Sequence, residues 1–338
     1  MVTYSIIIAT YNRLEELVEL FDSLDSVEFD PSLFEVVIID DGSTDQTQAF
    51  IASLIKPFGI QYHRQENQGP GAARNFGMKV AQGDYFIFID SDVLLPSNYL
   101  SAIDRYLSQN DVLAFGGPDN AHPSFSPMLK AINYSMTSFI GTGGTRGSKK
   151  SVTRFYPRSF NMGIHKSVFE KIGGMGGLRH GQDMDYSARI YDAGFKVGFI
   201  PDAVVFHKRR TNLRKFYKQI FNWGVARINL GRKYSYMMKP IYLAPAFLVV
   251  ATITVVILYF IFPVLWPIVS FGIWLAFFIA VFAFIQSLSR NGSVVVAFLS
   301  IITLYTQVIA YGLGTLSGVM QYFSGKKEAK GFVKKYYE

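Results

Sequence analysis

Short apolar runs alternate with helical patterns along the first 90 residues of the chain. Apolar runs indicate buried strands at 5–9, 34–39 and 85–89, with a weaker one at 60–63. Between them, apolar residues recur at intervals of three and four, which predicts helices over about 14–21, 47–55 and 72–81. This alternation predicts a mostly parallel α/β sheet covered by helices. No G-x-G-x-x-G motif follows the first strand, so the sequence does not favour a dinucleotide-binding domain.

A different pattern begins at Ile241. From there to Phe323 the only charged residue is Arg290, and turn-forming residues divide this stretch into apolar segments at about 241–262, 264–286 and 294–322. Each segment reaches the roughly 20 residues that a bilayer core requires, so we predict membrane helices rather than buried helices of a soluble protein. The third segment contains several Gly, Ser and Thr residues. It is therefore either a helix that packs closely on others or a re-entrant or interfacial segment.

Basic residues flank the apolar stretch and account for the formal net charge of +8. Lys208–Lys239 contains ten Lys or Arg residues and no acidic residue, and a second cluster lies within 326–335. Because hydrophobic segments adjoin both clusters, we predict contact with anionic membrane lipids rather than with nucleic acid. Within the first cluster, Asn212–Leu230 has apolar residues at helical spacing with Lys and Arg between them, which predicts an amphipathic helix in the membrane interface.

Polar residues follow the predicted strands where each of them ends. Asp90-Ser91-Asp92 closes the run 85–89, and its two carboxylates suit a hard cation such as Mg²⁺ or Mn²⁺. Open α/β sheets bind ligands at this edge. Thr10–Arg13, Asp40–Asp45 and the Gly-rich Asn67–Asn75 follow the other strands in the same way. An Asp-rich turn alone is a common strand ending, so the combination, not the single motif, indicates a binding site.

These stretches, in this order and spacing, resemble family 2 glycosyltransferases of the GT-A fold over about residues 4–207. The resemblance implies inverting transfer of a sugar from a nucleotide-diphosphate donor, UDP more often than GDP, with a divalent cation on the diphosphate. It assigns donor binding to Thr10, Tyr11, Asn12, Asp40, Asp41, Asn67, Gly71, Arg74 and Asp90. It assigns metal binding to Asp90, Asp92 and His207.

A separate motif, Gly181–Arg189, resembles the acceptor-site segment of the same family, in which Glu or Gln precedes a key Asp. The resemblance makes Asp183 the general base that deprotonates the acceptor hydroxyl. It also places Asn161, Gln182 and Asp185 on the acceptor side. Asp185 has an alternative role as an acidic residue that favours the start of a helix.

Several of these side chains have alternative interpretations. Arg74 is expected either to contact a phosphate, to contact Asp90, or to be a surface charge of its helix. His207 is a metal ligand or a cation that faces the membrane, and His165 and His180 are weaker ligand candidates. The loop 141–150, rich in Gly and basic residues, is either a lid over donor or lipid phosphate or a disordered connection.

The patterns divide the chain into a catalytic GT-A domain (1–206), a basic amphipathic region (207–240), a membrane domain of two or three spans (241–323) and a basic tail (324–338). Cysteine is absent, which excludes disulfides and thiolate metal sites, and no basic leader segment precedes the first strand. The positive-inside rule places the catalytic domain on the cytoplasmic side of an integral membrane protein. Three full spans would put the basic tail on the other side, against the same rule.

The acceptor predicted from this arrangement is held by the membrane, as a polyprenyl phosphate or a lipid-linked saccharide. Processive polysaccharide synthases carry Gln-x-x-Arg-Trp on an interfacial helix, whereas Gln219–Trp223 has Asn222 in place of the Arg. No hydrophobic segment precedes the catalytic domain, which also favours single addition. A processive synthase and a non-catalytic scaffold that binds nucleotide sugar remain the alternatives. A transporter is disfavoured because the apolar segments lack internal repeats and charge.

Overall fold

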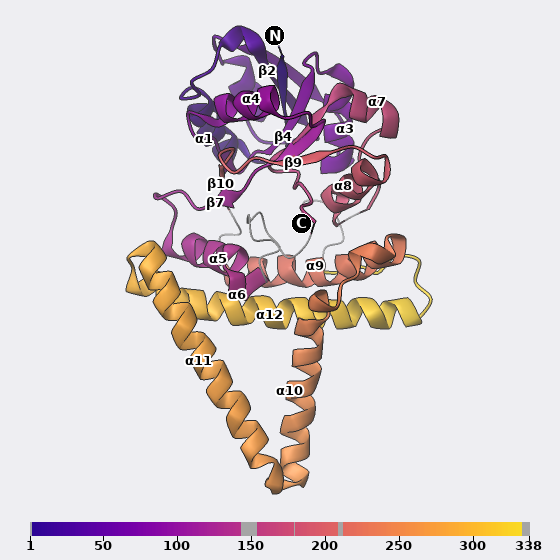
Figure 1. Ribbon diagram of the computed structural model, residues 1–338. Coiled ribbons are helices and arrows are strands. Elements are labelled where there is room, and N and C mark those ends of the chain that lie inside the picture. The colour runs from indigo at the N-terminus through magenta and orange to yellow at the C-terminus, as the bar shows by residue number, and fades with distance from the viewer. Residues whose placement is uncertain (1, 143–153, 179, 209–211, 333–338) are drawn as a thin grey trace. The chain divides into compact units, whose positions relative to one another are not determined.

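The computed structural model describes residues 2–142, 154–178, 180–208 and 212–332, which form two compact units (Figure 1). The first unit comprises 2–122, 154–178 and 180–208, and the second comprises 123–142 and 212–332. A segment from the middle of the first domain's sequence, 123–142, thus belongs to the second unit. The proposed lid loop lies almost entirely outside the described residues, as do Arg209, Arg210, Lys334 and Lys335.

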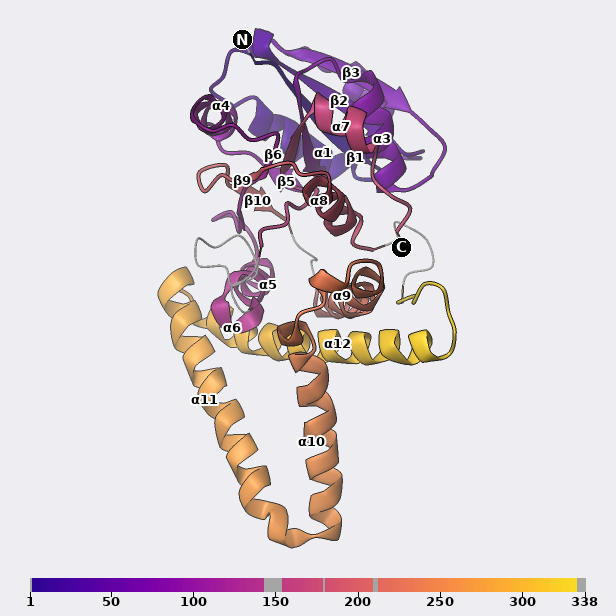
Figure 2. The same ribbon diagram turned by 45° about the vertical axis from the view of Figure 1, so that its right-hand side comes forward.

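A seven-stranded sheet in the order β3-β2-β1-β4-β8-β6-β9 is the framework of the first unit (Figures 1 and 2). Within this sheet only β8 runs antiparallel to its neighbours, which confirms the prediction of a mostly parallel sheet. The register pairs Thr10 with Asp40 and Ala9 with Asp90, so polar residues gather at one edge. The strands are β1 (Tyr4–Thr10), β2 (Phe34–Asp40), β3 (Gly59–Arg64), β4 (Tyr85–Asp90), β6 (Ala114–Gly116), β8 (Met162–His165) and β9 (Val197–Phe199).

Helices cover both faces of this sheet, which explains why its central strands are apolar throughout. Ile6 and Ile8 point into one apolar cluster with side chains of α1 and α4, whereas Ile7 points into a second cluster with side chains of α3, α7 and α8. The helices of this unit are α1 (Leu14–Leu24), α2 (Thr47–Ala52), α3 (Pro70–Val80), α4 (Tyr99–Gln109), α7 (Lys166–Ile172) and α8 (Gln182–Asp192), with a 3₁₀ turn at Pro31–Leu33.

A small second sheet in the order β5-β10-β7 adjoins the strand ends of the first unit. It consists of β5 (Val93–Leu94), β7 (Asp119–Asn120) and β10 (Val205–His207). β10 runs antiparallel to β5, with His207 opposite Val93, and the Lys208 N–H donates to the Asp92 carbonyl at 2.8 Å. This pairing brings His207 beside Asp92, although the two lie 115 positions apart in the chain.

The second unit consists of helices (Figures 1 and 2). α5 and α9 pack against α12. α10 and α11 form a hairpin that extends away from α12. The Ser135 and Thr303 hydroxyls, 2.7 Å apart, connect α5 to α12, and the Tyr134 hydroxyl donates to Gln286 of α11 at 2.9 Å. The helices are α5 (Pro127–Thr137), α6 (Phe139–Thr142), α9 (Leu213–Lys233), α10 (Ala244–Ile261), α11 (Trp266–Asn291) and α12 (Val294–Phe323), joined by 3₁₀ turns at Ser235–Met237, Pro240–Tyr242 and Pro263–Leu265.

The small residues of α12 allow α9 to approach its backbone closely. A Cβ placed on Gly314 would lie 2.1 Å from the Phe221 carbonyl oxygen, and one on Gly224 would lie 2.3 Å from the Tyr311 carbonyl oxygen. Each helix therefore supplies a glycine where the other needs space. α12 is one continuous helix of 30 residues, so the small residues serve helix packing and not a re-entrant loop.

Gly314→Val is expected to separate α9 from α12 and to lower the free energy of unfolding by about 2 kcal/mol or more, because a backbone atom cannot yield to the new side chain. Gly272→Val on α11 is the matched control, since a Cβ there meets no atom within 4 Å. Thermal unfolding of the two variants in the same detergent measures the difference. Equal stability would contradict the close packing of α9 on α12.

α10, Pro263–Asn291 and α12 are each long and apolar enough to cross a membrane. They differ in burial. Of the most apolar 18-residue stretch, 6% is buried in each of the first two segments, against 39% in α12. The hairpin thus exposes large apolar side chains such as Phe247 and Phe260, whereas α12 buries one face against other helices. Exposed apolar surface of this extent is typical of contact with lipid.

Residues 326–332 return along α9 and are held by side chains of that helix. Asn229 exchanges two hydrogen bonds of 2.9 Å with the backbone of Ala329, and Asn222 accepts one of 2.9 Å from the Phe332 N–H. Asn222, which replaces the arginine of the processive synthase motif, is buried and holds the returning chain. Asn222 therefore has a structural role within the helical unit, where it holds the backbone of Phe332.

Candidate active site

Asp90, Asp92 and His207 lie together in the first unit and could hold a metal ion. Each offers one ligand atom, and these atoms lie within 4.8 Å of one another. Asp90 ends β4, Asp92 follows two residues later, and β10 carries His207, whose Nε2 lies 3.2 Å from Asp92 Oδ1. Two carboxylates and an imidazole are a donor set that fits Mg²⁺ or Mn²⁺, so these residues fit the cation that the sequence predicts.

Two arginines lie beside this cluster. Arg74 of α3 is buried, and its Nη2 donates to Asp90 Oδ1 at 2.5 Å, so of its proposed roles the structure shows the contact with Asp90. Arg13 Nη1 lies 3.9 Å from Asp92 Oδ2 and 2.7 Å from Glu16. Burial lowers the pKa of Arg13, but the charges of Asp92, Glu16 and Asp90 and the hydrogen bond to Glu16 together raise it above its ordinary value. Arg13 was not among the predicted site residues, although it lies in the motif that follows the first strand.

Asp41 is fully buried and organises the turn that leads into α3. Its Oδ1 accepts hydrogen bonds from Gln65 Nε2 at 2.6 Å and from the Gln68 N–H at 2.9 Å. Its Oδ2 accepts one from the Gly69 N–H at 2.8 Å. These bonds fix the Gly-rich turn next to the sheet edge, a role that is independent of any bound nucleotide.

Asp41→Ala is expected to lower the free energy of unfolding by about 3 kcal/mol, because buried donors then lose a charged acceptor. Asp22→Ala, which removes an exposed carboxylate, is the control and should change stability little. Chemical denaturation of both variants measures the difference. A loss below about 0.5 kcal/mol for Asp41→Ala would contradict the structural role.

Asp40 and Asn12 connect the ends of β1 and β2. Asp40 Oδ1 accepts from the Ser43 N–H at 2.7 Å and Oδ2 from the Tyr62 hydroxyl at 2.7 Å; burial and this hydrogen bond raise the pKa of Tyr62. Asn12 has a positive φ of 50°, and its Oδ1 accepts from the Thr44 N–H at 2.7 Å. Both side chains thus hold the loop that follows β2.

The other donor-side residues lie along the same edge. Thr10 Oγ1 is buried and has no hydrogen-bond partner among the described residues. Tyr11 is half-buried and Asn67 is exposed. Gly71, in the first turn of α3, lies against α8: a Cβ there would lie 2.7 Å from both Gln182 Nε2 and Oε1. This contact brings the predicted acceptor motif next to the Gly-rich turn.

Asp183 lies in the first turn of α8 and is partly exposed. Its Oδ1 accepts from the Met184 N–H at 2.9 Å, and its Oδ2 lies 3.6 Å from Arg158 Nη1. Arg158 was not predicted, because no sequence pattern relates it to a residue 25 positions later. The arrangement leaves a carboxylate at the surface with a cation beside it.

Asp185 points into the protein and not toward solvent. It is fully buried, and its Oδ2 lies 3.3 Å from Arg189 Nε. The same guanidinium donates to the carbonyl oxygens of Ile172 at 2.9 Å and Gly174 at 2.5 Å. The pair therefore positions the loop before α8, whose Met175 backbone is also held by Asn75 of α3.

Asn161 connects the segments that lead into β7 and β10. It is 1% exposed, accepts a hydrogen bond from the Tyr99 hydroxyl at 2.8 Å, and donates to the carbonyl oxygens of Ala203 at 2.8 Å and Pro118 at 3.3 Å. Pro118 precedes β7 and Ala203 precedes β10. Asn161 therefore positions the small sheet that carries His207.

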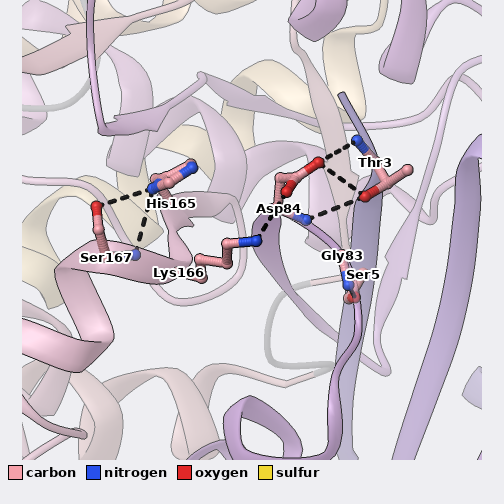
Figure 3. Close-up of polar contacts among 7 residues, drawn as sticks. All are labelled: Thr3, Ser5, Gly83, Asp84, His165, Lys166 and Ser167. Atoms are coloured by element: carbon pink, nitrogen blue, oxygen red, sulfur yellow. Dashed lines mark hydrogen bonds and ion pairs between the residues drawn. The ribbon is translucent and has the colours of Figure 1, made fainter. Parts of the chain in front are cut away.

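His165 pairs with Tyr85 at the start of β4, the opposite end of that strand from Asp90. Figure 3 shows it beside Ser167. The Ser167 N–H donates to its Nδ1 at 3.2 Å, which caps the start of α7. Beside it, Asp84 accepts from the Thr3 N–H at 3.1 Å and from Lys166 Nζ at 3.0 Å. Among the described residues, neither His165 nor His180 belongs to a metal-ligand cluster.

Lowering the pH from about 7.5 to about 5 is expected to reduce the Tm of the wild type more than that of His165→Asn. Burial lowers the pKa of His165, so the unfolded chain takes up this proton more readily than the folded chain. Stability is fully present above the unfolded pKa of about 6.5 and falls as the pH drops toward the lower folded pKa. Asn keeps a capping acceptor and does not titrate. Equal Tm losses would contradict this role.

The chain is similar in sequence to known glycosyltransferases. The model of the Glycosyl transferase family 2 matches residues 5–173. TarS of Staphylococcus aureus, a poly(ribitol-phosphate) beta-N-acetylglucosaminyltransferase, is 33% identical over 33% of the chain, and the chain spans only 20% of the length of TarS. The O-antigen chain rhamnosyltransferase RfbN of Salmonella typhimurium is 27% identical over 65% of the chain and 71% of RfbN.

Among solved structures, the mannosyltransferase PcManGT from Pyrobaculum calidifontis, determined in complex with GDP-Man and Mn²⁺, has the same fold, with a TM-score of 0.64 at 16% identity. The likeness covers 93% of the chain and 87% of PcManGT. The family match spans 169 of 338 residues (5 to 173), half of the chain, and with this likeness it confirms the GT-A fold that the motifs predict. This chain belongs to glycosyl transferase family 2.

Proposed function

We propose that the chain is a membrane-bound inverting glycosyltransferase that moves a sugar from a nucleotide-diphosphate donor to a membrane-held acceptor. The observation that supports it most strongly is the cluster of Asp90, Asp92 and His207 at the ligand-binding edge of the sheet. The acceptor is a polyprenyl phosphate or a lipid-linked saccharide. UDP is the proposed nucleotide of the donor, and GDP is the alternative that a donor screen distinguishes.

The cluster holds a divalent cation, which neutralises charge on the leaving nucleoside diphosphate when bound. Arg74 keeps the Asp90 carboxylate in place through its short hydrogen bond. Thr10 ends β1 at the donor edge, and its hydroxyl has no partner within the described residues. Asp40, Asp41 and Asn12 serve the donor by shaping its loops, since their carboxylate and amide oxygens already accept hydrogen bonds from the chain.

Asp183 is the proposed general base. An inverting transfer needs a base that removes a proton from the acceptor hydroxyl as this hydroxyl attacks the sugar. Asp183 is a partly exposed carboxylate in the first turn of α8, and the Gly71–Gln182 contact keeps this helix next to the Gly-rich turn. Asp185 and Asn161 support the acceptor side as positioning residues, because both are buried within the protein.

The helical unit attaches the chain to a membrane in this proposal. The α10–α11 hairpin enters the bilayer, since its apolar side chains are exposed, and α12 lies in the interface with α9. Two crossings return the chain to its starting side. The basic tail then lies on the same side as the basic helix α9, which satisfies the positive-inside rule with a cytoplasmic catalytic domain.

Cysteine labelling tests this topology directly, because the natural chain contains no cysteine. Ala52→Cys, in exposed α2, and Lys330→Cys, in the returning chain, are expected to react with an impermeant maleimide from the same side of sealed vesicles. Val264→Cys, at the tip of the hairpin, should not react from that side. Labelling of residues 52 and 330 from opposite sides would contradict a two-crossing hairpin.

The donor is identified by thermal stabilisation. A ligand that binds only the folded protein raises Tm, so a panel of UDP- and GDP-sugars with Mn²⁺ is expected to contain one that stabilises the wild type. The shift should disappear in chelator and in Asp92→Asn. Slow metal-dependent hydrolysis of that donor would argue against a non-catalytic scaffold. Donors that bind equally well without metal would contradict the proposed site.

A further inference from the structure

Arg227 lies where three elements of the helical unit meet. It belongs to α9, its Nε donates to the Tyr311 hydroxyl of α12 at 3.2 Å, and its Cζ lies 3.9 Å from the centre of the Tyr242 ring. Tyr242 ends the 3₁₀ turn Pro240–Tyr242, directly before α10 begins at Ala244. The guanidinium is therefore held at the base of the α10–α11 hairpin by a hydroxyl and an aromatic face.

The charge of Arg227 is not neutralised within the described residues. Its Nη1 is buried and has no hydrogen-bond partner, and no ion pair to Arg227 is present among the described residues. The sequence offers little choice: residues 123–144 contain no acid, and Glu328 is the only one between 209 and 334. A guanidinium does not lose its proton in proteins, so a half-buried one is stabilised by a neighbouring anion.

The position of Arg227 indicates what that anion is. Residues Phe247 and Leu248, in the first turns of α10, are exposed and apolar, so the membrane-facing surface begins just beyond Tyr242. Tyrosines at such a boundary are typical of the headgroup level of a bilayer. The anions at this level are lipid phosphates, and the planar fork of arginine matches phosphate oxygens while its face stacks on an aromatic ring.

We propose that Arg227, oriented by Tyr242 and Tyr311, binds the phosphate group of a membrane lipid. This inference rests on the proposed membrane attachment. It names a recognition element for a phosphorylated lipid in the helical unit, separate from the cluster of Asp90, Asp92 and His207. Arg227 is only half-buried, so its guanidinium remains within reach of a phosphate at the headgroup level. The Nε–Tyr311 bond together with Tyr242 stacking prevents the side chain from turning away.

Lipid titration of the purified full chain in a non-ionic detergent tests the site. Phosphatidic acid is expected to raise Tm, whereas diacylglycerol with the same acyl chains, which lacks only the phosphate, is not. Arg227→Gln should require about tenfold more phosphatidic acid for the same shift, equivalent to about 1.4 kcal/mol. Arg214→Gln is the matched control, because Arg214 is exposed in the first turn of the same helix.

Three results would overturn the proposal. They are an unchanged titration for Arg227→Gln, an equal loss for Arg214→Gln, and an equal shift with millimolar inorganic phosphate, which would indicate a site for the free anion. If Arg227→Gln does not fold, Arg227→Lys replaces it: the charge remains but the stacked fork is lost, and about threefold weaker binding is expected. The readout requires no sugar transfer, so a failed glycosyltransferase assay would leave this test intact.

Discussion

Replacing Asp92 with asparagine is expected to lower kcat for sugar transfer by about a thousandfold, equivalent to about 4 kcal/mol of transition-state stabilisation. Asp92 is the central residue of the proposed cation site, since its carboxylate lies 3.2 Å from His207 Nε2 and close to Asp90. Asn loses the negative charge but keeps the shape, so the cation and the diphosphate that it neutralises are both held less well.

Asp202→Asn is the control for Asp92→Asn. Asp202 is an exposed acid three residues before β10, so its loss tests whether any charge change near the small sheet has the same effect. Activity is measured with saturating donor, and Mn²⁺ binding by titration calorimetry. Near-normal transfer by Asp92→Asn, or full activity of the wild type in chelator, would contradict a metal-assisted reaction.

Asp183→Asn is expected to lower kcat by about 10²- to 10⁴-fold while donor affinity changes less than about twofold. Asn cannot accept the proton of the acceptor hydroxyl, but Asp183 is not part of the metal cluster, so donor binding should remain. This split between kcat and binding distinguishes a general base from a residue that merely supports folding.

Two variants on the same helix provide the comparison for Asp183. Asp192→Asn, at the exposed end of α8, should behave as the wild type. Asp185→Asn should instead lower Tm, because Asp185 holds the Arg189 side chain that fixes the loop 172–174. If Asp183→Asn lowered donor affinity and kcat together, or retained normal turnover, another residue would be the base.

The central strands were predictable because both faces of the sheet are covered by helices. Burial on both sides requires continuous apolar runs, and β1, β2 and β4 lie within one residue at each end of the runs at 5–9, 34–39 and 85–89. The position of the Asp90–Asp92 motif at the edge of the sheet was likewise predictable, since the motif directly follows a strand. The placement of His207 followed from the family resemblance, and the structure explains it through the pairing of β10 with β5.

The contacts that sequence could not predict are those between distant segments without periodicity. Arg13 near Asp92 and Arg158 near Asp183 depend on how loops meet after folding. The sequence predicts that Asp41 binds a ligand, yet its carboxylate accepts three hydrogen bonds from the turn before α3. The segment 123–142 joins the helical unit through α5, although its sequence lies within the expected catalytic domain.

The third apolar segment was ambiguous for a physical reason. Small residues at Gly312–Gly318 favour close helix contacts equally well inside a bilayer and at its surface. Only tertiary structure shows that Gly314 and Gly318 face α9, an amphipathic helix, so that α12 is partly covered where α10 and α11 are not.

Transfer of labelled sugar into lipid tests the central claim most directly. The purified chain is incubated with the stabilising nucleotide sugar, Mn²⁺ and a lipid extract, and label is counted in the organic phase. We expect metal-dependent label there with the wild type, none in chelator, and about a thousandfold less with Asp92→Asn. Absence of label from the organic phase with every donor, or label that is insensitive to chelator, would contradict a metal-assisted transferase with a membrane-held acceptor.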